Sequence, residues 1–199
     1  MSGFKYIARF YNIGIALSGL FVIYNKAVRL IDLKAGDRLL DVGCGSGTML
    51  KKLRAKFGND VQLFGVDPSP QMLDVARSKA AGLNITFKVA YGSDLPLIDR
   101  SQDWVISTLA FHHMPTEEKI KAVGELARVL KPGGLALISD LGRPKGIVGS
   151  VLHLISRAHA FTAGNMDIVE SELSKQGLVV TKIERSLGWV EHMLIQKAS

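Results

Sequence analysis

A glycine-rich segment directly after a short apolar run constrains the fold of this 199-residue chain more than any other feature of its sequence. Residues 38–42 are mostly apolar and are predicted to form a buried strand, and Gly-Cys-Gly-Ser-Gly follows at positions 43–47. Three glycines at alternate positions let the backbone turn sharply and approach a ligand closely. Residues 48–57 have the pattern of a helix, whose first amide groups would face that ligand. The sequence therefore predicts a strand, a ligand-binding turn and a helix in succession.

Strand-like and helix-like segments alternate along the rest of the chain. Further strands are expected at 61–66, 85–89, 104–108 and 135–139, further helices at 70–81, 116–130 and 165–176, and two last strands at 179–184 and 190–196. Pro132, Gly133 and Gly134 are expected to break the helix before the fifth strand. This alternation predicts an α/β fold of the Rossmann-like type, in which a mostly parallel sheet carries helices on both faces. Ligands of such sheets bind at the carboxyl ends of the strands.

The N-terminal region lies outside this alternation. Apolar residues recur every three or four positions over 4–31, which predicts a helix that Gly14, Ser18 and Gly19 can bend. Lys5 and the apolar run that follows resemble a signal peptide, but we expect no cleavage and a cytoplasmic protein. We expect one domain, made of an N-terminal helical lid (1–35), a cofactor-binding core (36–140), a substrate-side insertion (141–164) and a C-terminal helix with the last two strands (165–199).

Charge and cysteine content narrow the classes of site. The formal net charge of +7 is compatible with nucleic acid, anionic lipid, an anionic ligand or a surface that merely carries excess lysine. Cys44 is the only cysteine in the sequence, so an intramolecular disulfide and a cysteine-based metal site are excluded. No other set of metal-ligating side chains stands out, and we expect no metal.

An acidic residue stands twenty positions after the glycine segment. Asp67 follows the second expected strand, where a carboxylate can accept hydrogen bonds from both hydroxyls of a ribose. The segment lacks the last glycine of the dinucleotide fingerprint, which argues against a nicotinamide cofactor. Either feature alone has a plain structural interpretation, as a tight turn or a helix cap. Together they favour a ligand that contains a nucleoside.

At this point the sequence resembles the class I S-adenosylmethionine-dependent methyltransferases. The resemblance spans about residues 36–140 and is carried by LLDVGCGSG (39–47), GVDPSPQMLDVAR (65–77), GSDLPLIDRSQDWVIS (92–107) and RVLKPGGLALIS (128–139). It implies S-adenosylmethionine as the cofactor and a seven-stranded sheet whose seventh strand is antiparallel. The N-terminal helix, glycine loop and histidine pair look like those of the quinone and phospholipid methyltransferase group.

The resemblance also implies roles for individual residues. The amino-acid half of the cofactor would be held at the first motif, the ribose by Asp67, the adenine near Pro68, Met72, Asp94 and Leu95, and the methyl donor beside Thr108, Leu109 and His112. The first-motif residues implied as cofactor-binding are Asp41, Gly43, Cys44, Gly45 and Gly47.

Methyl transfer from a sulfonium mostly requires alignment of the acceptor and exclusion of water. A base is needed only where the acceptor must lose a proton, and His112 or His113 is the candidate for that role, although such a pair can also only shape the cofactor pocket. Tyr11, Tyr91 and His153 are candidate substrate contacts, each with a packing or surface role as the plain alternative.

The acceptor is constrained mainly by what the sequence lacks. The fourth strand ends in Ser-Thr-Leu-Ala-Phe rather than the Asn/Asp-Pro-Pro-aromatic motif of enzymes that methylate DNA bases, and no RNA-binding module is present. The N-terminal helix and residues 141–164 are apolar with basic flanks, which suits a hydrophobic acceptor or transient contact with an anionic membrane. We therefore expect methyl transfer to a small, hydrophobic or lipid-like acceptor such as a quinol or a phospholipid amine. The alternatives are an RNA methyltransferase and a catalytically silent, cofactor-binding accessory protein.

Overall fold

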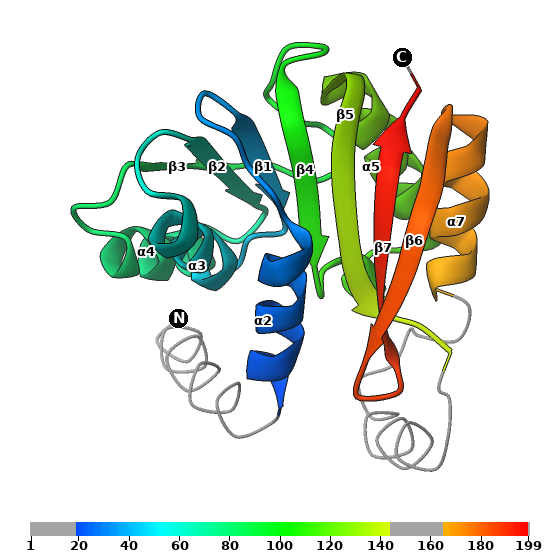
Figure 1. Ribbon diagram of the computed structural model, residues 1–199, viewed down its shortest axis with the longest axis horizontal. Coiled ribbons are helices and arrows are strands. Elements are labelled where there is room, and N and C mark those ends of the chain that lie inside the picture. Colours follow the sequence, from blue (N-terminus) through cyan, green and yellow to red (C-terminus); the bar gives the residue numbers. More distant parts are fainter. Residues whose placement is uncertain (1–18, 144–164, 199) are drawn as a thin grey trace.

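The computed structural model describes residues 19–143 and 165–198, and its centre is one seven-stranded sheet (Figure 1). The strand order is β3-β2-β1-β4-β5-β7-β6. Strand β7 runs antiparallel to both of its neighbours, whereas the other pairings are parallel. The strands are β1 (Arg38–Val42), β2 (Gln62–Asp67), β3 (Ile85–Val89), β4 (Gln102–Thr108), β5 (Leu130–Leu141), β6 (Leu178–Ser186) and β7 (Val190–Lys197). The predicted fold class is thereby confirmed, including the antiparallel seventh strand.

Helices cover both faces of this sheet (Figure 1). They are α2 (Leu20–Leu30), α3 (Thr48–Phe57), α4 (Pro70–Lys79), α5 (Thr116–Val129) and α7 (Asn165–Lys175), with a short 3-10 helix η1 (Phe111–His113). The helices α2, α3 and α4 share one apolar cluster with the sheet, and α5 and α7 share another. Each cluster is built from the apolar side of its helices, so the sheet is buried on both faces.

Most predicted element boundaries lie within a few residues of the observed ones, and β5 differs most. It begins at Leu130 rather than at residue 135, directly after α5 ends. Its pairing with β4 jumps from Gln102 opposite Leu130 to Trp104 opposite Leu135. The expected Pro-Gly-Gly break is thus a bulge inside the strand. The first part of the predicted helix 4–31 lies outside the described residues, and its last part is α2.

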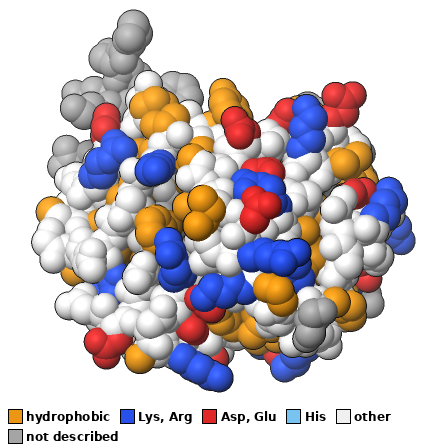
Figure 2. Space-filling model, turned by 90° about the horizontal axis from the view of Figure 1, so that it is seen from above, with side chains coloured by type: hydrophobic (Ala, Val, Ile, Leu, Met, Phe, Trp, Pro, Cys, Tyr) orange, Lys and Arg blue, Asp and Glu red, His pale blue; other side chains and the backbone are white. Residues whose placement is uncertain are grey.

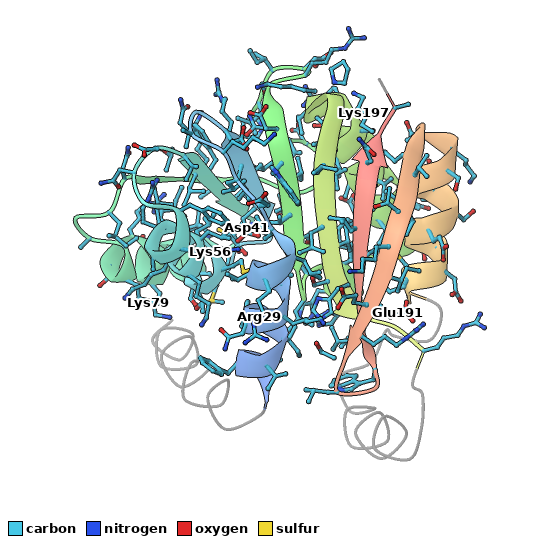
Figure 3. The ribbon with its side chains drawn as sticks, viewed as in Figure 1. Arg29, Asp41, Lys56, Lys79, Glu191 and Lys197 are labelled. Atoms are coloured by element: carbon cyan, nitrogen blue, oxygen red, sulfur yellow. The ribbon has the colours of Figure 1, made fainter. Side chains whose placement is uncertain are left out.

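Two lysines of α3 hold α2 against the core. Lys56 Nζ donates to the carbonyl oxygens of Val28 (2.9 Å) and Ile31 (2.8 Å), which lack partners within the helix at its C-terminal end. Lys52 Nζ donates to Asn25 Oδ1 at 2.9 Å. Figure 3 shows Lys56 between the two helices. These contacts fix α2 over the carboxyl ends of the central strands.

His192 of β7 is fully buried between two serines. Its Nδ1 lies 2.8 Å from Ser139 Oγ, and its Nε2 lies 2.8 Å from Ser186 Oγ. Burial lowers the pKa of His192 to about 4, and Lys26 adds to this effect. The imidazole is therefore neutral at physiological pH and serves as a hydrogen-bonded link among β5, β6 and β7.

This buried histidine predicts a loss of stability in mild acid. An unfolded chain protonates His192 near pH 6.5, whereas the folded chain does so near pH 4, so the free energy of unfolding falls as the pH drops through that window. Between pH 7 and pH 5 we expect wild type to lose about 2 kcal/mol more than His192→Gln. Denaturant unfolding at both pH values measures this difference, with His113→Gln as the exposed-histidine control. Equal losses in wild type and His192→Gln would contradict it.

The described residues bear on contact with a membrane and with nucleic acid. Among these residues, no helix is both long and apolar enough to cross a bilayer. The face in Figure 2, seen from above the sheet of Figure 1, intersperses Lys and Arg with acidic and apolar side chains. On that face, the positive charge of the protein does not form one continuous surface of the kind that binds a nucleic-acid backbone.

Candidate functional site

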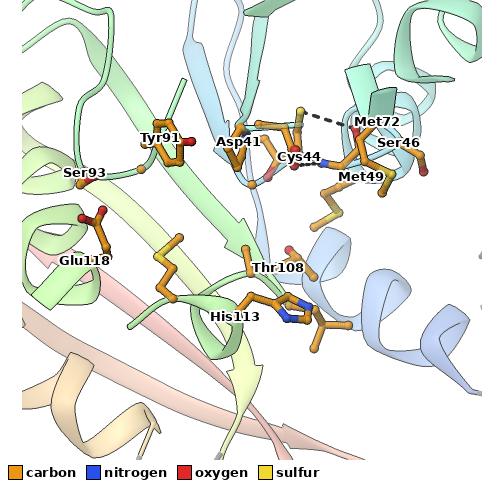
Figure 4. Close-up of a pocket in the computed structure, with 18 of the residues that line it drawn as sticks. Asp41, Cys44, Ser46, Met49, Met72, Tyr91, Ser93, Thr108, His113 and Glu118 are labelled. Carbon is orange, nitrogen blue, oxygen red and sulfur yellow. Dashed lines mark hydrogen bonds between the residues drawn. The ribbon is translucent and has the colours of Figure 1, made fainter. Parts of the chain in front are cut away.

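A cavity of about 770 Å³ opens beside the carboxyl ends of β1, β2 and β4. Figure 4 shows Ser46, Met49 and Met72 at one end, Tyr91 and Glu118 toward the other, and Asp41 between them. This is the edge of the sheet where the alternation of strands and helices predicts a ligand. The lining residues are Tyr24, Asp41, Gly43, Cys44, Gly45, Ser46, Met49, Asp67, Pro68, Met72, Tyr91, Gly92, Ser93, Asp94, Thr108, Leu109, Ala110, His113, Met114, Pro115 and Glu118.

The glycine loop follows β1 and forms the floor of the cavity. The amides of Gly43 and Cys44 donate to the carbonyl oxygen of Val66 at 2.8 and 2.9 Å, which ties the loop to β2. Gly43 has a φ of 73°, and a Cβ at this position would lie 2.4 Å from the Cβ of Ala110. A larger residue would therefore be strained and would push the loop away from the segment after β4.

Asp67 links the glycine loop to the start of α4. Its Oδ2 accepts from the amide of Gly45 at 2.8 Å, and its Oδ1 accepts from the amide of Ser69 at 2.9 Å. Each carboxylate oxygen has a further lone pair, and the residue lines the cavity. Asp67 can thus hold the loop in place and still accept from hydroxyl groups of a ligand.

Asp41, at the end of β1, is a buried acid with an unsatisfied oxygen. It is 1% exposed, and its Oδ2 has no hydrogen-bond partner within the described structure. Burial raises the pKa of Asp41 to about 8, and the negative charge of the neighbouring Asp67 contributes to this rise. A buried polar atom without a partner is unusual and costly. Asp41 lines the cavity, so a cationic ligand group there would offset both the cost of burying its carboxylate and the repulsion from Asp67.

The other acidic position in the predicted cofactor site lies in the connection between β3 and β4. Tyr91 and Asp94 pair across a tight turn, in which the Asp94 amide donates to the Tyr91 carbonyl at 3.1 Å. All four residues of this turn line the cavity. Leu95 does not, because its side chain is 4% exposed and packs in the core beneath α5.

The two histidines after β4 occupy different environments. His113 is exposed and lines the cavity beside Thr108 (Figure 4). His112 faces Asp140 instead, with its Nδ1 2.8 Å from Asp140 Oδ1 and its backbone amide 3.2 Å from Oδ2. The two imidazole centres are 3.9 Å apart. Of the two, only His113 is therefore placed to touch a molecule in the cavity. His112 contacts Asp140 instead.

Most residues predicted to bind the cofactor line this one cavity. Among them, Gly47 and Leu95 do not: Gly47 precedes α3 and packs near Ala76 and Phe87. Tyr91 lines the cavity at 64% exposure, whereas Tyr11 and His153 lie outside the described residues. The assignment of these residues to cofactor and substrate stays a prediction.

Several lining residues were not predicted from the sequence. Tyr24 and Met49 have the spacing of core residues on helices, and Glu118 resembles a first-turn helix acid. No local pattern distinguishes them from packing residues. The remaining unpredicted positions lie within two residues of predicted ones: Ser46, Gly92, Ser93, Ala110, Met114 and Pro115. Adjacency to a motif is thus the signal by which those could have been found.

The chemistry of the cavity fits the cofactor that the sequence motifs imply. S-adenosylmethionine has a cationic ammonium and sulfonium, a ribose diol and an adenine. Among the described lining residues, carboxyl groups belong to Asp41, Asp67, Asp94 and Glu118, and none of these residues is Lys or Arg. The orphaned Asp41 oxygen suits the ammonium, and Asp67 has capacity for the diol. No group of residues that could hold a metal occurs in the described ranges.

Cys44 lies in the cavity wall without the properties of a nucleophile. It is 8% exposed, and burial raises the pKa of its thiol, with Asp41 as the next contributor. The thiol therefore stays protonated near neutral pH, whereas the thiolate is the reactive form. A mechanism through a covalent cysteine intermediate is disfavoured by this environment.

Comparison with known proteins agrees with this geometry. Residues 39–134 match the protein family described as a methyltransferase domain. The chain is 35% identical over 120 residues to 27-O-demethylrifamycin SV methyltransferase of Amycolatopsis mediterranei, covering 58% of this chain and 43% of that protein. It is 32% identical over 132 residues to demethylmenaquinone methyltransferase of Tropheryma whipplei, covering 66% and 53%. The chain thus spans about half the length of these curated relatives.

The fold also matches solved structures. A SAM-dependent methyltransferase from Aquifex aeolicus superposes with a TM-score of 0.67 and 23% identity, covering 87% of this chain and 88% of that one. This likeness covers more of the chain than the region matched by the family.

Proposed function

We propose that this chain transfers a methyl group from S-adenosylmethionine to a small, hydrophobic or lipid-like acceptor. The premise is that the chain belongs to the class I S-adenosylmethionine-dependent methyltransferases. One observation carries the proposal: the glycine loop, Asp67, Asp94 and His113 line a single cavity. A silent accessory protein would often have lost Asp67 or the glycines of the loop, and all of them are present.

The residues of the chain have defined tasks in this reaction. When bound, the cofactor supplies a methyl group on a positively charged sulfur, which leaves as a neutral thioether. Asp41 and Asp67 hold and orient the cofactor, while Thr108 and Leu109 form the wall where the acceptor would enter. Tyr24 of α2 also lines the cavity, where it would limit access of water. Catalysis then depends on alignment of the acceptor more than on proton transfer.

His113 is the candidate base for an acceptor that must lose a proton. Its imidazole lines the cavity, and histidine exchanges protons near neutral pH. Asp140, which is fully buried, accepts from the His112 amide and lies within hydrogen-bond distance of its Nδ1. This contact fixes the η1 segment on which both histidines lie. We therefore assign His113 to proton transfer and His112 to positioning.

Three features support a small apolar acceptor. The cavity contains Tyr24, Met49, Met72, Leu109 and Met114 in addition to its acids. The acids disfavour a polyanionic acceptor such as RNA within the cavity. The two curated relatives are named for demethylmenaquinone and for 27-O-demethylrifamycin SV, which are small organic molecules.

Transient contact with a membrane is part of the same proposal. Phe21 and Val22 on α2 are 57% and 49% exposed, and the Lys52 ammonium lies 4.5 Å from the Phe21 ring centre. Exposed apolar side chains beside a cation suit an anionic membrane surface. A lipid-like acceptor would be reached there by a protein of the cytoplasm.

Calorimetric titration with S-adenosylhomocysteine, repeated with NADH, tests the cofactor assignment. We expect micromolar binding of the first and none of the second, because the glycine loop lacks the last glycine of the dinucleotide fingerprint. Methyl transfer from labelled cofactor to demethylmenaquinol, to a phospholipid amine and to short RNA then tests the acceptor. Labelled RNA alone would contradict the proposed acceptor class, and failure to bind S-adenosylhomocysteine would contradict the proposed function as a whole.

A further inference from the structure

The connection between β3 and β4, residues 90–101, crosses the sheet without a helix of its own. It nevertheless carries the Tyr91–Asp94 turn that lines the cavity. Ordering an irregular segment costs roughly 1–2 kcal/mol per residue in backbone entropy, so specific contacts must offset that cost. Those contacts come largely from two residues near the C-terminal end of α5.

Glu125 and Arg128 of α5 bind the backbone immediately after this turn. Glu125 Oε2 accepts from the amide of Leu95 at 2.7 Å, and Arg128 Nη2 donates to the carbonyl oxygen of Leu95 at 3.0 Å. Arg128 Nη1 also donates to the carbonyl oxygen of Leu97 at 2.8 Å and to Asp99 Oδ1 at 2.6 Å. Both polar backbone groups of Leu95 are thus held by α5, and so is the segment after it.

The two side chains also hold each other. Arg128 Nε and Nη2 each donate to one oxygen of Glu125 at 2.7 Å, which is the two-point geometry that fixes a guanidinium most firmly. The hydrogen bond from Arg128 is the largest cause of the lowered pKa of Glu125, so the pair is ionised near neutral pH. Both residues are only partly exposed, at 19% and 30% of their side chains. Neither lines the cavity.

We infer that Glu125 and Arg128 are positioning residues for the adenosine half of the cofactor site, acting through Leu95 on the Tyr91–Asp94 turn. This inference rests on the proposed function. Asp94 immediately precedes Leu95, so loosening the Leu95 backbone displaces the carboxylate that would meet the adenine. The anchored Leu95 side chain, which is buried in the core rather than in the cavity, adds to the same restraint.

The test replaces Glu125 with glutamine and follows two ligands. The new side chain in Glu125→Gln keeps one acceptor oxygen but places an amide group against Arg128. We expect affinity for 5′-methylthioadenosine and for S-adenosylhomocysteine to fall by the same factor, roughly tenfold, since both carry adenosine. Glu172→Gln is the matched control, because Glu172 forms an i,i+3 pair with Lys175 on α7, away from the cavity.

Hydrogen exchange in the absence of ligand gives the second readout. Amides of residues 93–99 should exchange faster in Glu125→Gln than in the Glu172→Gln control, while protection of the central strands stays unchanged. Unchanged affinity for both ligands, or faster exchange spread over the whole sheet, would overturn the positioning role. If wild type binds neither ligand, the proposed function fails, and the exchange pattern still decides whether the pair orders this segment.

Discussion

Replacing Asp41 with asparagine is expected to stabilise the ligand-free protein while it weakens cofactor binding. The folded protein holds a proton on Asp41 up to a pKa of about 8, whereas an unfolded chain releases it near 3.8. The free energy of unfolding of wild type therefore falls as the pH rises from about 4 to about 8. Asp41→Asn lacks this fall, so at pH 7 it should be more stable by on the order of 4 kcal/mol.

Binding should change in the opposite direction. An asparagine cannot form an ion pair with the ammonium of S-adenosylhomocysteine, and we expect a loss of affinity of roughly tenfold to a hundredfold. On this assignment wild type binds the ligand with its Asp41 carboxylate ionised, so affinity should rise toward pH 8. Binding at pH 7 should release close to one proton. Calorimetry in two buffers with different heats of ionisation counts that proton.

The control for this experiment is the exposed carboxyl of Asp60. Asp60→Asn should leave the free energy of unfolding, the affinity and the number of released protons as they are in wild type. Asp41→Asn should instead abolish proton release. If Asp41→Asn is no more stable than wild type and still releases a proton on binding, another group is responsible and the ammonium does not meet Asp41.

The fold could be predicted because its local signals agree with one another. Pro70 at the start of α4 and the glycines after β1 mark boundaries whose position depends only on nearby sequence. The bulge in β5 could not be placed this way, since it depends on pairing with Gln102 and Trp104 of another strand. Sequence spacing thus located elements well and their registers poorly.

Site residues could be predicted where they belong to a sequence motif or would contact the ligand through their backbone. It was less predictable where tertiary packing decides the direction of a side chain. Leu95 follows a cavity residue but points into the core, and His112 faces Asp140 while its neighbour His113 faces the cavity. Tyr24 lines the cavity from α2, which Lys52 and Lys56 hold against the rest of the protein. None of these directions follows from spacing along the chain.

The second large effect is expected at His113. Loss of a positioned base costs roughly 10²- to 10⁴-fold in rate, so His113→Ala should lower kcat by that order for an acceptor whose hydroxyl must be deprotonated. The affinity for S-adenosylhomocysteine should change little, because we assign the holding of the cofactor mainly to the glycine loop and its acids. Asp140→Asn should have a smaller effect, since it loosens the η1 segment without removing the imidazole.

A pair of phenolic acceptors separates proton transfer from a purely structural role. Fluorination makes a phenol more acidic at little change in size, so the fluorinated acceptor depends less on a base. We expect the rate of His113→Ala to fall much more on the parent phenol than on the fluorinated one. In wild type, protonation of a base makes the rate decline toward acid pH, and this decline should be absent in His113→Ala. Equal losses on both acceptors, with that decline retained, would show that His113 only shapes the cavity. The alignment of acceptor and cofactor would then account for catalysis without a base, as methyl transfer to a neutral amine requires.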